Sequence, residues 1–424
     1  MFRSFTCAMV TLLLALFLLP ALADEAFDIT GECSFFRAGN RQKTTAAKMT
    51  DQNYNTYAEF AARQSFEIDA GGFDIGALYL SFYDRPVPLY VEGLVDGVWV
   101  KSEEGGQFLQ EYLTLPEGST RARVTSLSRS RLWIAEIRVF TPGDRPKDCA
   151  QWHIGGKADL MLVSCHPDDE LLWFGGLLPT YAGERKLEVQ NVIAVPSTPI
   201  RKQELLNALW HCGVTRYPFY MDLSDTRADT MSNQYWRWGY LVVPRLIAEA
   251  VRRYQPDVVV THATDGEYGH PGHRVVADAV LQAVPEAAAE DKWTESAERY
   301  GTWQVQKLYL HKWPENQIHL DWHVPLKAFG GKDSFDVAKE AFRFHKSQIS
   351  GGWMMEEGGE QDNAFFGLVF SMVGEDERGD DFMENILPDS YLVTEDAEEG
   401  YDEETDELEA PKVNLPVRQV PQNP

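Results

Sequence analysis

The chain has 424 residues, a hydrophobic fraction of 44% and a formal net charge of -26 at pH 7. A chain of this length is expected to fold as more than one domain, and its apolar content is sufficient for sizeable cores. The acidic balance argues against nucleic acid as a partner, because phosphates require a basic patch on the protein.

The first residues have the pattern of a secretory signal peptide. Arg3 precedes an apolar run from Ala8 to Leu19, and Ala21-Leu22-Ala23 matches a small-x-small cleavage site. The run is shorter than the ~20 residues of a spanning helix, which favours cleavage over an uncleaved anchor. We therefore expect removal of residues 1–23, an extracellular or periplasmic location, and no transmembrane segment afterwards.

Removal of the signal peptide leaves Cys33, Cys149, Cys165 and Cys212. An oxidising compartment permits disulfides. Cys33 and Cys149 bracket the N-terminal region, so we expect a disulfide that ties its ends together. Cys165 is expected to remain a small buried thiol.

Residues 24–148 have the pattern of an all-β domain. Runs rich in β-branched and aromatic residues occur at 77–82, 89–92, 98–100, 121–124 and 133–140. Turn sequences such as Asp69-Ala70-Gly71-Gly72 separate them. Short strands with frequent turns predict a sandwich or jelly roll.

Strands alternate with helices in residues 149–373, after a linker around 142–146. We expect strands at 160–164, 189–195, 217–221 and 256–262, and helices at 202–210, 246–254 and 275–283. This alternation predicts a Rossmann-like three-layer α/β sandwich, with a mostly parallel sheet covered on both faces. In such folds the functional site lies at the carboxyl ends of the strands.

The last segment, 374–424, is strongly acidic. Residues 374–410 contain 17 Asp and Glu against a single Arg. Such a composition predicts a solvated, disordered tail, with a partner-binding segment as the alternative.

Two polar clusters directly follow predicted strands. His166-Pro167-Asp168-Asp169-Glu170 comes after the strand 160–164, and His270-Pro271-Gly272-His273 comes after the strand 256–262. On a turn that enters a helix, side chains at i and i+3 point toward one position. Imidazole and carboxylate suit zinc, whereas calcium prefers oxygen ligands alone.

A catalytic zinc ion commonly takes three protein ligands and leaves a position for water. One His and one Asp of the first cluster and one His of the second make up this number. The remaining His and Asp168 are then available as acid and base. The spacing alone leaves open which residue takes which role.

Four segments resemble the LmbE-like, PIG-L family of zinc-dependent N-deacetylases. They are 165–170 with Gly175-Gly176, 200–205, 266–273, and 339–348, which is similar to the family's late helix. The resemblance implies a cofactor of zinc, or another divalent transition metal. It implies that His166, Asp169 and His273 bind the metal, that Asp168 is the general base, and that His270 acts on the tetrahedral intermediate.

The same resemblance implies substrate contacts. Arg201 would position the substrate, although a surface helix residue paired with Glu204 is the alternative. Tyr268 would contact the intermediate, and Glu170 would orient a metal ligand. The aromatic segment 233–240 is either a sugar-stacking wall or core packing.

The N-terminal region resembles discoidin-type, galactose-binding-like jelly rolls in two segments. Residues 49–56 are similar to an early loop of that family, and residues 134–140 to its final strand. The resemblance implies a possible glycan ligand of the N-terminal domain.

Together these features predict a secreted hydrolase that removes an N-acetyl group from an N-acetylglucosamine-type glycoconjugate. An amidase for another sugar amide, or a glycan-binding protein with a vestigial metal site, are the alternatives. Two departures from the deacetylase pattern weaken the inference of this protein's substrate from the family. Gly272 stands where the family often has Asp, and the segment 195–199 is short and rich in proline.

Overall fold

The computed structural model describes residues 25–37, 46–359 and 362–386. The predicted signal peptide therefore lies outside the described residues. The chain divides into two compact units, residues 1–388 and 389–424, and the description covers parts of the first unit alone. Among the described residues, every helix is too short or too polar to cross a membrane.

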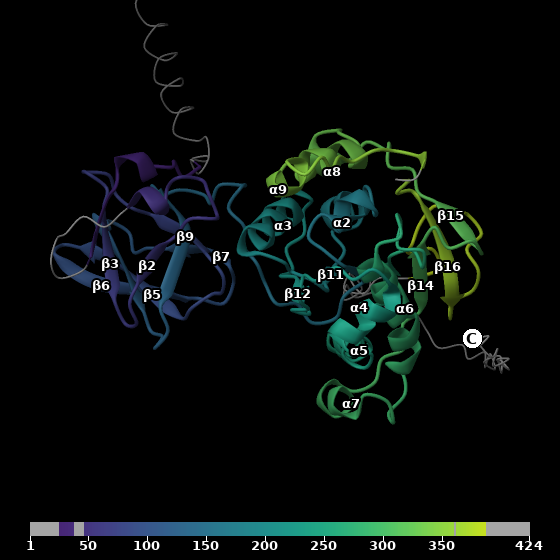
Figure 1. The fold of residues 1–424 in the computed structure, drawn as a ribbon. Coiled ribbons are helices and arrows are strands. Elements are labelled where there is room, and N and C mark those ends of the chain that lie inside the picture. Colours follow the sequence, from purple (N-terminus) through teal and green to yellow (C-terminus); the bar gives the residue numbers. More distant parts are fainter. Residues whose placement is uncertain (1–24, 38–45, 360–361, 387–424) are drawn as a thin grey trace, which may run out of the picture. The chain divides into compact units, whose positions relative to one another are not determined.

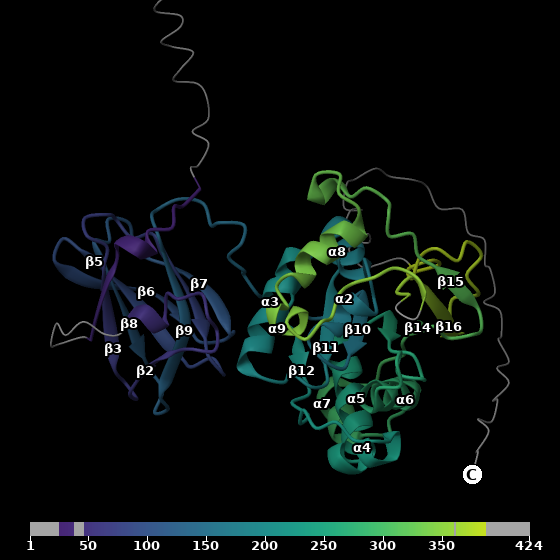
Figure 2. The ribbon, with the colours of Figure 1, turned by 45° about the horizontal axis from the view of Figure 1, so that its top comes forward.

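The N-terminal region consists of strands β1 to β9 in two antiparallel sheets (Figure 2). The first sheet has the order β1-β3-β8-β5-β6 and the second the order β2-β9-β4-β7. The strands are β1 (Ser34–Arg37), β2 (Ala58–Phe60), β3 (Ser65–Asp69), β4 (Ala77–Phe82), β5 (Leu89–Val95), β6 (Val98–Gly105), β7 (Gln110–Thr114), β8 (Arg121–Ser126) and β9 (Leu132–Phe140).

The two sheets share a core of alternate side chains. In β3 and β8 every second residue is buried, as expected for strands with one face against a core. Phe60 of β2 and Phe66 of β3 stack with ring centroids 4.5 Å apart and so join the sheets. The predicted β-rich character is confirmed, whereas the jelly-roll and galactose-binding likeness remain predictions.

The following region (Figure 1) contains a mixed sheet. Its seven strands have the order β12-β11-β10-β13-β14-β16-β15. Strands β10 to β14 pair in parallel, and β16 is antiparallel to both of its neighbours. The strands are β10 (Leu160–Ser164), β11 (Val189–Ile193), β12 (Phe219–Tyr220), β13 (Val258–Thr261), β14 (Lys307–His311), β15 (Gln317–His319) and β16 (Phe365–Ser371).

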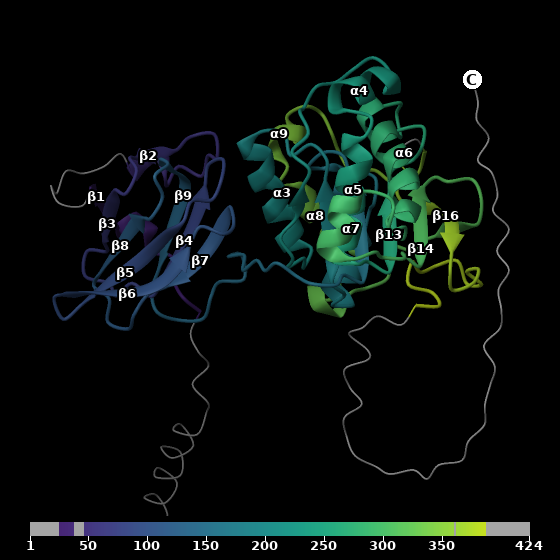
Figure 3. The same cartoon turned by 90° about the horizontal axis from the view of Figure 1, so that it is seen from below.

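Helices cover both faces of this sheet. One face carries α2 (Asp169–Leu172), α3 (Pro199–His211), α8 (Ser334–Phe342) and α9 (Lys346–Ile349). The other side has α4 (Met231–Trp238), α5 (Val242–Tyr254), α6 (Pro271–Glu286) and α7 (Thr294–Tyr300), of which α5 and α6 lie in front of the sheet in Figure 3. Short helical turns are η1 (Thr30–Glu32), η2 (Ala46–Lys48), η3 (Pro179–Glu184) and η4 (Lys327–Phe329).

Strand β10 shows why the sheet needs both layers. Leu160 and Leu162 belong to one buried cluster, whereas Met161 and Val163 belong to the other. All five residues of β10 are buried, as expected for a central strand with helices on both faces. The predicted α/β architecture with a sheet between helices is confirmed.

The parallel pairing of β10 with β13 sets the position of the site. Leu160 pairs with Val258 and Val163 with Thr261, so the two strands end side by side. The Thr261 hydroxyl donates to the carbonyl of Val163 at 2.9 Å and reinforces this register. The loops that carry the two predicted clusters therefore leave the sheet next to each other.

The predicted late helix is interrupted. Residues 339–348 form the end of α8, a break around His345, and most of α9. The break brings the fully buried His345 ring to Glu170, with Nε2 2.7 Å from Oε1. A helical pattern in the sequence does not reveal such a break, because a distant partner causes it.

The predicted acidic tail begins later than residue 374. Asp376 forms an ion pair with the fully buried Lys307 of β14 and accepts a hydrogen bond from the Tyr309 hydroxyl. Phe382 is also fully buried. Residues 374–386 therefore pack against the sheet, because a buried lysine requires a carboxylate partner. Residues 387–424 lie outside the described part.

The predicted disulfide between Cys33 and Cys149 is wrong, since both residues are free thiols. The Cys33 thiol donates to the carbonyl of Ile29 at 3.2 Å. The Cys149 sulfur lies 3.6 Å from Nη1 of Arg138. Their places at the two ends of the region do not bring the sulfur atoms together, and each has a different local partner.

Candidate metal centre and active site

The first cluster forms a tight turn between β10 and α2. Asp169 is the first residue of α2, and its Oδ2 accepts the backbone N–H of His166 at 2.7 Å. Its Oδ1 accepts the indole N–H of Trp173 at 3.0 Å. Asp168 precedes the helix with φ 115°, a conformation that side chains disfavour. Both oxygens of Asp169 are therefore oriented, while Asp168 points elsewhere.

The second cluster begins α6. His270 is the N-cap of this helix, and its Nδ1 accepts the backbone N–H of Gly272 at 3.2 Å. His273 lies in the first turn and is almost fully buried. Gly266 and Gly269 in the preceding loop have φ of 74° and 82°, a region that favours glycine. The loop can thus turn sharply enough to bring α6 over the end of β10.

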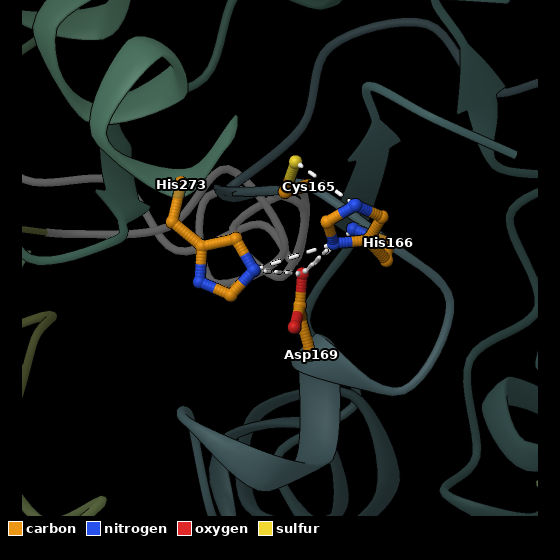
Figure 4. A group of neighbouring side chains, drawn as sticks. All are labelled: Cys165, His166, Asp169 and His273. Atoms are coloured by element: carbon orange, nitrogen blue, oxygen red, sulfur yellow. Dashed lines mark hydrogen bonds and ion pairs between the residues drawn. The ribbon is translucent and has the colours of Figure 1, made fainter. Parts of the chain in front are cut away.

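Three side-chain atoms of the predicted ligands meet at one point (Figure 4). Asp169 Oδ2 lies 3.3 Å from His166 Nδ1 and 3.3 Å from His273 Nε2. The two ring nitrogens are 3.3 Å apart. Tetrahedral zinc with bonds of about 2.0–2.1 Å separates its ligand atoms by about 3.3–3.4 Å. The three predicted ligands therefore fit a zinc ion.

Glu267 fixes the orientation of this donor set. Its Oε2 lies 2.7 Å from Nδ1 of His273, and its Oε1 lies 3.0 Å from Nδ1 of His262 and 3.1 Å from Nδ1 of His311. Burial would raise the pKa of Glu267, but His262 and the other imidazoles hold it well below the usual range. A proton on Nδ1 of His273 leaves Nε2 free for a metal ion.

His262 lies close to the predicted ligands, but its side chain forms a hydrogen bond with the backbone. Its Nε2 accepts the backbone N–H of Cys165 at 2.9 Å. Burial lowers the pKa of His262, but the charge of Glu267 raises it by more. Nε2 can accept this hydrogen bond only when it carries no proton. The ring therefore ties the end of β10 to Glu267.

The pKa values of Asp169 and Asp168 are shifted in opposite directions. Burial disfavours ionisation of Asp169, but His273 and His166 outweigh it and hold its pKa well below the usual value. Burial and the adjacent Asp169 raise the pKa of Asp168 well above the usual value, against the charge of Arg201. Asp169, the predicted ligand, therefore has the lowered pKa, and Asp168 is the more basic carboxylate.

Two partners hold the side chain and backbone of Asp168. Arg201 donates from Nη2 to Oδ1 at 2.8 Å and also to the carbonyl of Pro167. The backbone N–H of Asp168 donates to Oε2 of Glu170 at 2.7 Å, and Glu170 contacts His345. Glu170 therefore supports the predicted base rather than a metal ligand. Arg201 pairs with Asp168, so the alternative partner, Glu204, is wrong.

His270 lies beside the ligands without joining them. Its ring centroid is 4.9 Å from that of His166 and 4.5 Å from that of His273. Burial, together with the charges of these two residues, lowers the pKa of His270 to about 3. Because its Nδ1 accepts from Gly272, the neutral ring carries its proton on Nε2. His270 is therefore a hydrogen-bond donor.

The space around Gly272 explains its departure from the family pattern. A Cβ atom at this position would lie 3.0 Å from Cys165 Sγ, 3.0 Å from the Trp238 ring and 3.1 Å from His270. The thiol and the indole occupy the volume that a larger side chain would need. Cys165 itself is fully buried, as expected, and burial raises the pKa of its thiol well above 9.0.

A pocket of about 180 Å³ opens over the ligand atoms. It has an aromatic side, in which Tyr268 stacks on Trp173 at 5.7 Å and contacts Trp353 at 5.4 Å between ring centroids. The charged and polar residues of its lining are His166, Asp168, Asp169, Arg201, Asp225, Arg227, His270 and Gln348. An apolar face opposite convergent polar groups is typical of a small-molecule site.

The aromatic segment 233–240 does not line this pocket. Within α4, Tyr235 and Trp238 are buried, whereas Trp236 is 78% exposed. The Trp238 indole donates to the carbonyl of Ser224 at 2.9 Å. The segment is therefore mainly packing, and the aromatic side comes from Trp173, Tyr268 and Trp353 instead.

Several residues of the site escaped the sequence analysis. Glu267, His262 and His311 form the network behind the ligands, and His345 supports Glu170. Glu267 lies in the same glycine-containing loop as Tyr268, which is the one local signal. His345 lies in the segment 339–348 that resembles the family's late helix, but its contact with Glu170 is tertiary, and only tertiary contacts reveal His311 of β14.

Comparisons with known proteins agree with the motifs. Residues 161–284 match the family model described as PIG-L: GlcNAc-PI de-N-acetylase. One curated relative is 1D-myo-inositol 2-acetamido-2-deoxy-alpha-D-glucopyranoside deacetylase 1 of Catenulispora acidiphila, 29% identical, with 38% of this chain and 57% of the relative covered. The protein of the same name from Frankia casuarinae is 28% identical, with 39% and 64% covered.

One similar solved structure is that of N,N'-diacetylchitobiose deacetylase from Pyrococcus horikoshii. It is 17% identical to this chain, with a TM-score of 0.35, and the match covers 45% of this chain and 71% of that chain. The chain spans about three fifths of the length of the curated relatives above. The family match supports the resemblance predicted from the motifs for residues 161–284.

Proposed function

We propose that this protein is a zinc-dependent N-deacetylase that removes the acetyl group from an N-acetylglucosamine-type amino sugar. The observation that carries the proposal is the triangle of ligand atoms, each 3.3 Å from the others, with the Asp168 carboxylate beside it in an open pocket. Three ligands with an accessible fourth position are typical of catalytic rather than structural zinc.

His166, Asp169 and His273 would hold the zinc ion, or another divalent transition metal. When bound, such an ion polarises a carbonyl group and lowers the pKa of water, which supplies a nucleophile near neutral pH. Glu267 contributes by keeping the proton of His273 on Nδ1. This arrangement of carboxylate, histidine and metal raises the basicity of the ligand and fixes its ring.

Asp168 is suited to accept a proton from the attacking water. Burial beside Asp169 raises its pKa, which makes it a stronger base than an exposed carboxylate. The hydrogen bond from Arg201 at 2.8 Å and the Glu170 contact at its backbone restrict its movement. Arg201 therefore positions the base, in addition to lining the substrate pocket.

His270 is suited to stabilise the negative oxygen that develops on the acetamide carbon. Its Nε2 carries the proton of the neutral ring, because Nδ1 accepts from Gly272. A fixed donor at such an oxygen commonly contributes about 3–4 kcal/mol to transition-state stabilisation. The phenol of Tyr268, 44% exposed at the pocket, is available as a second contact.

The pocket supports a sugar as the substrate. The rings of Tyr268, which stacks on the buried Trp173, and of Trp353 offer an apolar surface for the C–H face of a pyranose, and the lining also offers hydrogen-bonding groups. The printed names of the two curated relatives specify a 2-acetamido-2-deoxy-glucopyranoside, and that of the solved relative specifies diacetylchitobiose. Their shared element is an N-acetylglucosamine unit.

The test is zinc-dependent acetate release from a panel of acetylated amino sugars. We expect release with the zinc-loaded protein, loss after chelation, and loss in the Asp168→Asn variant. Release from other sugar amides but not from any N-acetylglucosamine compound would favour the amidase alternative. No release from either group, with glycan binding retained, would favour a binding protein with a vestigial site.

We also propose that the protein is secreted and that its β-rich N-terminal region binds a glycan. The support is the signal-like segment before residue 24 and the sequence resemblance of residues 49–56 and 134–140. N-terminal sequencing of protein from the culture medium tests the first point, with residue 24 expected first. A glycan array with the metal-free full chain tests the second, and the absence of any bound glycan would contradict it.

A further inference from the structure

The segment from Ser224 to Ala228 forms one rim of the pocket and is held in place by α4. Three hydrogen bonds with side chains of this helix fix the backbone of the segment. The Trp238 indole donates to Ser224 O at 2.9 Å, Arg237 Nη1 donates to Arg227 O at 3.1 Å, and the Ala228 N–H donates to Gln234 Oε1 at 2.9 Å. The rim is thus a fixed part of the site although it has no regular secondary structure.

A second attachment joins the rim to the base. The Ser197 hydroxyl donates to Asp225 Oδ2 at 2.7 Å and accepts from Arg201 Nη1 at 3.4 Å. Arg201 in turn pairs with Asp168. Asp225 is therefore part of the hydrogen-bonded chain that positions the base. The predicted proline-rich segment 195–199 contributes through Ser197, whose φ of 58° is unusual for serine.

The two arginines of the pocket differ in their partners. Arg201 is committed to Asp168 and to the carbonyl of Pro167. The guanidinium of Arg227 makes no hydrogen bond or ion pair with any residue in the described ranges, yet it lines the pocket.

We propose that Arg227 is an anion-binding position, and that the preferred substrates are N-acetylated amino sugars that carry a carboxylate or phosphate group. The inference rests on the proposed deacetylase function. A guanidinium binds either anion through two parallel hydrogen bonds, and the pairing is charge-assisted. The acetamide and hydroxyl groups of a neutral sugar do not require a full positive charge at the rim.

The location of Arg227 also separates its role from catalysis. The base, the predicted ligands and His270 lie at the β10 and β13 ends, whereas Arg227 is on the rim that α4 holds. An interaction made equally in the ground state and the transition state changes KM rather than kcat. The inference therefore predicts a specific effect on the KM of charged substrates.

The experiment compares N-acetylglucosamine 6-phosphate and N-acetylmuramic acid with neutral N-acetylglucosamine, using the zinc-loaded full chain. We expect the wild type to prefer at least one charged compound by about tenfold or more in kcat/KM, mainly through KM. In Arg227→Ala this preference should fall to near one, and in Arg227→Lys it should be intermediate. Raising the salt concentration should reduce the wild-type preference, because Arg227 is exposed.

The matched control is Arg245→Ala, which removes an exposed arginine of α5 that pairs with Glu249 at 3.7 Å and does not line the pocket. It should retain the wild-type preference. An equal loss of kcat/KM on charged and neutral compounds in Arg227→Ala would overturn the inference, as would a wild type without preference. The response of the two charged compounds distinguishes a carboxylate-binding from a phosphate-binding position.

A binding measurement separates this inference from the proposed function. Calorimetry with glucosamine 6-phosphate and glucosamine, on wild type and Arg227→Ala with equal zinc content, requires no turnover. If none of the acetylated sugars is hydrolysed, the proposed function fails. The anion-binding position then stands only if wild type binds the phosphorylated sugar more tightly and Arg227→Ala loses that difference, and it falls if the two sugars bind equally.

Discussion

Two pairs of neighbouring carboxylates occur in different regions of this protein, and their surroundings give them different properties. Asp168 and Asp169 lie at the end of β10 among Arg201 and three imidazoles. Asp51 and Glu136 lie in the N-terminal region, where both accept the backbone N–H of Asn53, at 3.0 and 2.9 Å. Neither of these two forms an ion pair with any residue the structure describes.

In each pair one carboxylate has a lowered pKa and the other a raised pKa, but the causes differ. In the first pair the neighbouring imidazoles outweigh burial and lower the pKa of Asp169, which leaves Asp168 as the more basic carboxylate. In the second pair burial and the charge of Asp51 raise the pKa of Glu136 to about 7. The two pairs therefore differ in what lowers the pKa of one member, which is imidazoles in the first pair and hydrogen bonds from Thr56 and Asn53 in the second.

The largest predicted effect is the removal of a metal ligand. Asp169→Asn or His273→Ala should abolish zinc binding and reduce acetate release below detection, because two ligands remain of three. Zinc content by elemental analysis and a deacetylation assay measure both effects. His323→Ala, in an exposed histidine outside the pocket, is the matched control and should bind zinc as the wild type does. Full activity of either ligand variant would contradict the assignment.

The second effect separates the base from the ligands. Asp168→Asn should lower kcat by about 10²–10⁴-fold, the usual contribution of general base catalysis, while zinc content remains unchanged. Glu136→Gln makes the same chemical change in the other pair and should leave kcat at the wild-type value. Loss of zinc from Asp168→Asn would instead make Asp168 a ligand, and the two pairs would differ less than we infer.

The third effect concerns the network behind the ligands. Glu267→Gln should weaken zinc affinity by about 10–100-fold, because an amide replaces the carboxylate that accepts the Nδ1 proton of His273. Competition with a chelator of known affinity measures this change. The control is Gln282→Glu on the exposed side of α6. It exchanges the same two residue types in the opposite direction and should not alter zinc affinity. Unchanged affinity in Glu267→Gln would show that the ring of His273 is fixed by packing alone.

The smallest effect lies in the N-terminal pair and depends on pH. Glu136 releases its proton near pH 4.5 in the unfolded chain and near pH 7 in the folded one. Between these values the folded state binds more protons, so its stability falls as pH rises. Glu136→Gln removes this loss and should stabilise the protein by about 1 kcal/mol at pH 8, allowing for partial exposure, but not at pH 4.

Thermal melts of the full chain at both pH values measure the difference. Glu117→Gln, in an exposed turn, should not change the melting temperature at either pH. An equal shift for Glu136→Gln at pH 4 and pH 8 would show that the substitution acts through packing rather than through the proton.

The sequence predicted the central elements well because their signals are local. The continuous apolar run of β10 and the aromatic-rich run of β4 coincide with the predicted ranges 160–164 and 77–82. Two helices begin earlier than predicted. Helix α3 begins at Pro199 rather than at residue 202, and α6 begins at Pro271 rather than at residue 275. Proline is compatible with the first turn of a helix, where its missing N–H has no partner to lose.

Errors arose where a distant partner decides the structure. Cys33 and Cys149 lie at suitable places in the sequence for a disulfide, but their sulfur atoms have other neighbours. Residues 374–386 have the composition of a disordered tail, but the ion pair between Lys307 and Asp376 holds them against the sheet. The alternative pairing of Arg201 with Glu204 was also wrong, because Arg201 pairs with Asp168 while it lines the pocket.

By itself, the sequence determined which residue types were available for chemistry and that they follow two buried strands. The i, i+3 spacing and the strand-to-helix turns are local properties, and local sterics fix them. The tertiary structure decided that β10 and β13 are neighbours, that Glu267 orients His273, and that His345 supports Glu170 through the break after α8. These relations depend on sheet order and on burial of charges between distant segments, which no local pattern encodes.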